Sequence, residues 1–181
     1  MMEQAVYKLS MVGFSALVMN SNDALLAETK LDKGRDQALY EREHFLDKCY
    51  RNDAGQLIIP ARCVKKALID ACKFYPGKPK GVAFRSFGPF IQSATIFPED
   101  AILDGSIKQV VPIPLTIVVN LDPSKGPRGP RGPRTRPMLP VPWSASLRFH
   151  VIDTILTQTV LSDIAERAGK QVGFLDARNI D

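Results

Sequence analysis

The chain has 181 residues, 45% of them hydrophobic, and carries 24 Lys and Arg against 19 Asp and Glu. This length and composition predict one domain, residues 1–181, with a sizeable core. No stretch approaches the roughly 20 consecutive apolar residues of a membrane span, and Glu3, Lys8 and Ser10 interrupt the N-terminal segment too soon for a signal peptide. We therefore expect a cytoplasmic protein without a membrane partner.

The first half of the chain predicts two strands and two helices. Residues 6–19 are rich in β-compatible side chains and predict a strand, which a polar loop follows. A short helix is expected over 37–48 and a brief strand over 56–59. Pro60 suits a first helical position, and apolar residues at helical spacing predict a helix that ends at 76–77. Those apolar residues are Val64, Ala67, Leu68, Ala71 and Tyr75.

The cysteines give no sign of a metal or a disulfide framework. Cys49, Cys63 and Cys72 are too few and too widely spaced for either. Cys63 and Cys72 fall within the helical pattern, so we expect buried thiols there. The sequence also lacks a Walker loop, a dinucleotide fingerprint and a metal-binding His pair. We therefore expect neither a metal nor a cofactor.

Basic and aromatic residues alternate after the second helix. Lys78, Lys80 and Arg85 are interleaved with Phe84, Phe87 and Phe90. Single-stranded nucleic acids bind in this way, with bases on rings and phosphates on cations. The alternative is that at least two rings are buried and anchor the loop.

Two alternating segments in the second half, 113–121 and 143–151, predict strands that pair as a hairpin. Between them three Gly-Pro-Arg triplets make a basic arm, residues 122–142, which we expect at the tip. The arm holds Lys125, Arg128, Arg131, Arg134 and Arg136 and no acidic residue between 125 and 137, so the remaining 19 basic residues equal the 19 acidic ones. In polyproline II geometry, with three residues per turn, the repeated arginines would share a face. This favours a polyanionic partner, and the alternative is a solubilising loop without a partner.

The C-terminal part predicts a helix and a final strand. Thr157 or Thr159 can cap a helix that ends at Gly169, and residues 171–175 predict a short strand. The order of elements is then that of a ferredoxin-like (βαββαβ), RRM-type fold of the α+β class, with insertions at about 20–59 and 76–110.

The segment 50–69, YRNDAGQLIIPARCVKKALI, resembles the strand and basic first helix of the RAMP superfamily. The segment 168–174 is similar in position to that family's C-terminal glycine-rich loop. The resemblance is to the RNA-binding backbone subunits of multi-subunit CRISPR effector complexes, which act in antiviral defence. It implies a ferredoxin-like palm, binding of guide RNA along a basic helix and loops, and a helical filament built with copies of itself and other effector subunits. By position, Arg62, Lys65 and Lys66 would contact phosphates, although this chain has Ala61, Arg62 and Cys63 where the family usually has serine.

We therefore expect a non-catalytic subunit that binds single-stranded RNA, such as a guide and possibly a target strand. One alternative is a metal-independent endoribonuclease of the same superfamily with His150 as its base. Another is a protein-interaction or inhibitor subunit that imitates such a backbone. The expected nucleic-acid-binding residues are Arg62, Lys65, Lys66, Lys78, Lys80, Arg85, Lys125, Arg128, Arg131, Arg134, Arg136 and Arg148.

Overall fold

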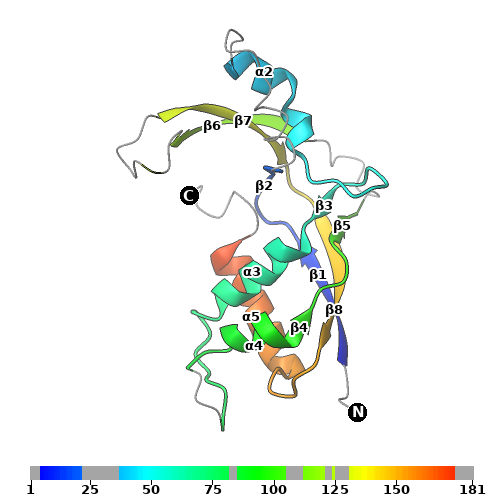
Figure 1. Ribbon diagram of the computed structural model, residues 1–181, viewed down its shortest axis with the longest axis vertical. Coiled ribbons are helices and arrows are strands. Elements are labelled where there is room, and N and C mark those ends of the chain that lie inside the picture. The colour runs from blue at the N-terminus through cyan, green and yellow to red at the C-terminus, as the bar shows by residue number, and fades with distance from the viewer. Residues whose placement is uncertain are drawn as a thin grey trace.

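Two antiparallel sheets form the framework of the protein (Figure 1). The computed structural model describes residues 5–21, 37–81, 85–104, 112–120, 124 and 131–173. The first sheet has the order β1 (Ala5–Val12), β8 (Ser144–Val151), β5 (Ala101–Leu103) and β3 (Ile58–Ile59), and β4 (Thr95–Ile96) also pairs with β8. The second sheet has the order β2 (Leu17–Val18), β7 (Arg131–Leu139) and β6 (Ile113–Asn120).

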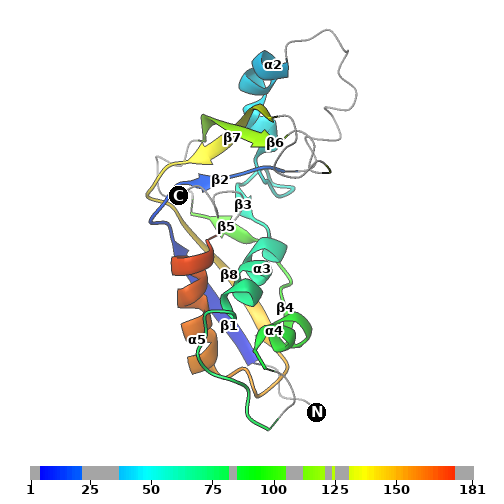
Figure 2. The same ribbon diagram turned by 90° about the vertical axis from the view of Figure 1, so that its left-hand side faces the viewer.

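Helices cover one face of the first sheet (Figures 1 and 2). They are α3 (Ala61–Ala71), α4 (Gly88–Ala94) and α5 (Gln158–Arg167), which a π-helical turn, η3 (Ala168–Val172), extends. The second sheet contacts α2 (Gln37–Glu43) and a 3-10 helix, η1 (Phe45–Lys48), through β7. No helix in the described part of the chain is long and apolar enough to cross a membrane.

Strand β8 lies at the centre of the first sheet. Along it, Ala145, Leu147, Phe149 and Val151 are buried, and the side chains between them are exposed or half-buried. The ring of Phe149 stacks on Phe97 at 4.9 Å and on Tyr7 at 5.8 Å. Because strand residues alternate between faces, this pattern places the core on the helical side and leaves the other face open.

The same two chain segments pass from one sheet to the other at Trp143. The predicted strand 6–19 is divided into β1 and β2, and the Gly13 N–H between them donates to the Trp143 carbonyl at 2.8 Å. The indole Nε1 donates to the Ser15 carbonyl at 2.9 Å. A Cβ on Gly13 would lie 2.1 Å from the indole ring, so only glycine fits there.

The α+β class predicted from the sequence is confirmed, and several elements lie where they were expected. Helix α3 buries Val64, Ala67, Leu68 and Ala71. Thr157 caps α5, because its side chain accepts a hydrogen bond from the Val160 N–H. Phe87 and Phe90 are buried in the core, as the alternative interpretation of that segment held, whereas Phe84 lies outside the described residues.

Two expectations for the strands were wrong. The segments 113–121 and 143–151 do not pair, because β6 pairs with β7 and β8 pairs with β1. The C-terminal half of the basic arm is therefore a strand within a sheet and not a tip. Residues 171–172 are part of the π-helical turn and not of a strand, because the helix continues through Gly169 and ends at Gly173, where φ is 70°.

The environment of the cysteines predicts their reactivity. Burial raises the pKa of both Cys49 and Cys72 to about 11, whereas Cys63 is only half-buried. At pH 8 about one in a thousand of the two buried thiols would be ionised. We expect Ellman's reagent to modify one thiol per chain rapidly in the native protein and all three after unfolding. Rapid modification of three thiols in the native state would contradict this packing.

Candidate nucleic-acid interface

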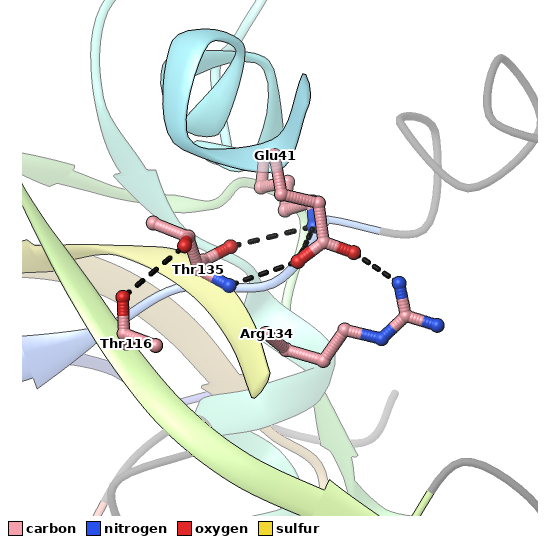
Figure 3. Close-up of polar contacts among 5 residues, drawn as sticks. Glu41, Thr116, Arg134 and Thr135 are labelled. Atoms are coloured by element: carbon pink, nitrogen blue, oxygen red, sulfur yellow. Dashed lines mark hydrogen bonds and ion pairs between the residues drawn. The ribbon is translucent and has the colours of Figure 1, made fainter. Parts of the chain in front are cut away.

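A buried carboxylate holds the basic strand β7 in place (Figure 3). Helix α2 directs Glu41 into the protein, where one carboxylate oxygen, Oε2, accepts the Thr135 N–H at 2.9 Å. The other, Oε1, pairs with the guanidinium of Arg134. Lys48 lies 3.6 Å from Oε2 and donates to the Thr135 carbonyl at 3.3 Å. Side chains from α2 and η1 thus bind both backbone groups of Thr135, where a neighbouring strand would otherwise be needed.

This geometry explains how a proline-rich segment forms a strand. The N–H and carbonyl of Thr135 point away from β6, and the Pro137 carbonyl accepts the Met19 N–H on that same side. Pro133 and Pro137 lie two residues on either side of Thr135, so their nitrogens also point away from β6. Their missing N–H groups therefore remove no hydrogen bond from the β6–β7 ladder.

The arginines of the former arm have different environments. Arg134 forms an ion pair with Glu41, in contrast to the free, phosphate-binding arginine expected from the sequence. Arg136 is half-buried, and burial lowers its pKa while Glu41 and Tyr50 partly offset that effect. The predicted contacts of Lys125 and Arg128, and of the Arg131 side chain, lie outside the described residues.

Helix α3 carries a basic stripe along its exposed side. Arg62 and Lys66 are exposed one turn apart, and Lys73 is exposed just beyond the end of the helix. Asp70 lies between Lys66 at 3.1 Å and Lys73 at 3.2 Å. Although burial would raise the pKa of Asp70, the hydrogen bonds from the two lysines lower it, so it remains ionised at neutral pH. This side of α3 therefore carries three cations and the carboxylate of Asp70. We call the three cations, Arg62, Lys66 and Lys73, the α3 stripe.

Lys65 differs from its neighbours on the same helix. Its ammonium group donates to the Thr95 carbonyl at 2.8 Å and lies 6.0 Å from the centre of the Phe97 ring. Burial lowers its pKa. Lys65 thus joins α3 to the end of α4, and this placement favours a structural role over the phosphate contact expected from the sequence.

The N-terminus of α3 is already occupied by an acidic side chain. Asp100 Oδ1 accepts the Ala61 N–H at 2.7 Å. This carboxylate compensates the positive end of the helix dipole. Any phosphate would therefore meet side chains along α3, and not the backbone N–H of Ala61 at its start.

The other expected residues lie in two further places. Lys78, Lys80 and Arg85 are exposed in the connection between α3 and α4, at the lower end of the molecule in Figure 1. Arg148 is exposed on the open face of β8, away from the helices. The structure therefore does not bring the expected residues into one surface. It aligns Arg62 and Lys66 with Lys73, which the sequence analysis did not include although it is eleven residues, or three helical turns, from Arg62.

In the described part of the chain, the endoribonuclease alternative gains no cluster of catalytic groups around its candidate base. His150, the proposed base, lies opposite Val6 on β1 and Ile96 on β4, so its cross-strand neighbours offer no activating side chain. Within the described residues, no three His, Cys, Asp or Glu side chains are placed to hold a metal ion.

Comparison with known proteins gives a similarity to a solved structure. No protein-family model matches the chain, and no curated protein matches it. Among solved structures, the crystal structure of Cmr6 from Pyrococcus furiosus is similar, with a TM-score of 0.51 over 98% of this chain and 94% of that one. The two sequences are 14% identical, so the similarity shows a related fold.

The buried carboxylate predicts a large effect of one substitution. Glu41→Gln would leave the buried Lys48 and the neighbouring Arg134 without their shared negative charge. We expect the free energy of unfolding to fall by about 3 kcal/mol, measured by urea denaturation. The matched control is Glu43→Gln, because Glu43 is exposed on the same helix, and it should change stability by less than about 0.5 kcal/mol. Equal stabilities of the two variants would show that Glu41 does not hold β7.

Proposed function

We propose that this protein is a non-catalytic, RNA-binding subunit of a CRISPR-type effector ribonucleoprotein. The observation that carries the proposal is the similarity over nearly the whole chain to Cmr6, a RAMP-like subunit of a type III CRISPR complex. The RAMP-like segment 50–69 supports it independently, because it contains the start of α3 and therefore Arg62 and Lys66.

The arrangement of the first sheet supports the finer part of the proposal. β8 lies between β1 and β5 and is antiparallel to both strands. α3 lies in the connection from β1 to β5, and α5 follows β8. This is the order of the first five elements of a ferredoxin-like fold, and we propose that the protein is a variant of it with a second sheet inserted.

The proposed path of the RNA is along the α3 stripe towards the α3–α4 connection. Arg62, Lys78, Lys80 and Arg85 are exposed and make no ion pair with a described residue, which leaves their charges available to phosphates. Arg62 also interacts with the Tyr50 hydroxyl, so a phosphate would share or replace that contact. The mechanism is electrostatic positioning of a strand, because each cation that meets a phosphate releases a condensed counterion. Assembly with copies of itself and with other effector subunits is the further part of this proposal.

Co-purification tests the proposal most directly. We expect the protein to carry RNA of defined length, seen as a raised ratio of absorbance at 260 to 280 nm and by sizing of the extracted strand. Treatment with RNase should shrink the assembly. A protein purified from its natural source without nucleic acid but with a second polypeptide would instead favour the protein-interaction alternative.

The salt dependence of binding locates the strand on the protein. Each phosphate contact on a single strand contributes about −0.7 to the slope of log K against log salt. We expect replacement of Arg62, Lys66 and Lys73 by Ser to flatten the slope for an oligouridylate by about 2 in filter-binding assays. Arg42→Ser, on the exposed side of α2, is the control and should leave the slope unchanged.

A parallel variant separates the stripe from the Gly-Pro-Arg repeat. Replacement of Lys125 and Arg128 by Ser should flatten the slope by about 1.4 if the repeat also contacts the strand. An effect of this variant alone would place the RNA on the repeat and not on α3. An unchanged slope in the stripe variant, with RNA still bound, would contradict the proposed path.

A further inference from the structure

The open face of the first sheet has a regular arrangement of charge and apolar surface. Eleven positions of five strands point to this face, away from the helices. At its centre Lys8 of β1 lies directly opposite Arg148 of β8. On either side are the rows Val6–His150–Ile96 and Ser10–Ser146–Ile102–Ile58, and Val12–Ser144 lies beyond the second. Ile58, at the β3 edge, is buried. We call this surface the open face.

Among the described residues, the two central cations have no anionic partner. Lys8 and Arg148 are both exposed, and neither side chain makes an ion pair or a hydrogen bond within the described part of the chain. Like charges that face each other directly across antiparallel strands destabilise the pair. An acidic group that docked between them would remove this repulsion, so the face is complementary to a carboxylate or a phosphate.

The surrounding side chains favour a protein over a nucleic acid. Four aliphatic residues of the open face are substantially exposed: Val6 59%, Val12 63%, Ile96 49% and Ile102 43%. No Phe, Tyr or Trp occurs at these positions, and the only ring is the half-buried imidazole of His150, whereas binding of single strands relies on stacking of successive bases on rings. An apolar patch with arginine near its centre is instead typical of a protein interface.

The histidine next to the cationic pair has an unmet hydrogen bond. His150 is half-buried, and its Nδ1 atom is buried without a hydrogen-bond partner. Buried polar atoms are nearly always paired. A flip of the ring would exchange Nδ1 with a carbon atom and so change the neighbours of this nitrogen, and a carboxylate docked on the open face is one acceptor that could then receive its N–H.

We propose that the open face is the docking surface for another protein, which presents a carboxylate between Lys8 and Arg148 and aliphatic side chains against Val6, Val12, Ile96 and Ile102. This interface does not depend on RNA binding, because the helical layer separates it from the α3 stripe (Figure 2). The occupant is a neighbouring subunit with an acidic and aliphatic surface.

Carbodiimide cross-linking of the complex purified from its natural source tests the chemistry of this contact. The reagent joins an amine to a carboxylate without a spacer, so we expect mass spectrometry to find Lys8 joined to an Asp or Glu of another polypeptide. Lys8→Arg should abolish this cross-link but retain the polypeptide, because the charge is kept and the amine is lost. The test requires the cross-link at Lys8, because a polypeptide could be retained through another surface.

Charge reversal gives a second measurement with a distinctive signature. Lys8→Glu places opposite charges across the strands, so the melting temperature should not fall, while recovery of the cross-linked polypeptide should fall by about tenfold or more. Arg42→Glu, an exposed cation on α2 outside both the open face and the proposed RNA path, is the control and should not change that recovery. The proposal is wrong if Lys8 forms no cross-link to protein, if ultraviolet cross-linking joins the open face to RNA, or if Lys8→Glu retains the polypeptide.

Discussion

The carboxylate of Glu41 is the constraint on which the second sheet depends. A buried carboxylate is stable only where donors and cations surround it, and here they come from η1 and β7. The same contact provides partners for the N–H and carbonyl of Thr135, which no strand covers at that edge of β7. One side chain therefore lets a segment rich in proline and arginine form the central strand of a sheet, and positions α2 and η1 on it.

This arrangement also connects the two sheets. β2 and β7 pair in the second sheet, and the chain continues from them to β1 and β8, which pair in the first. Both connections meet where the Trp143 indole packs on Gly13 and bonds to Ser15. The short connection from β7 to β8 therefore fixes the start of the central strand of the first sheet, which carries Arg148.

The spacing of hydrophobic residues predicted where α3, α5 and β8 lie along the chain. The same spacing did not predict β7. Its buried positions Thr135, Pro137 and Leu139 do alternate, but the segment is rich in proline and arginine, which normally indicate a solvated loop. The contact that stabilises β7 joins residues 94 positions apart, and no local pattern reports it. The sequence also could not predict which cations are exposed. Lys65 and Lys66 are adjacent, yet only Lys65 donates to the carbonyl of Thr95, which belongs to another element. The opposition of Lys8 and Arg148 likewise follows from the register of β1 on β8.

The helical layer and the first sheet separate two positively charged surfaces, the α3 stripe and the open face. On the helical side, Asp70 compensates part of the α3 stripe and keeps its lysines aligned along one side of the helix. On the open face, no acid of the described segments is paired with the central cations, and aliphatic side chains surround them. A phosphate backbone tolerates the first environment because it needs only spaced cations, whereas the second becomes stable when a surface with both a carboxylate and apolar groups covers it. Because the sheet and its helices lie between the two surfaces, the proposed RNA strand and the proposed protein partner would not compete for the same charges.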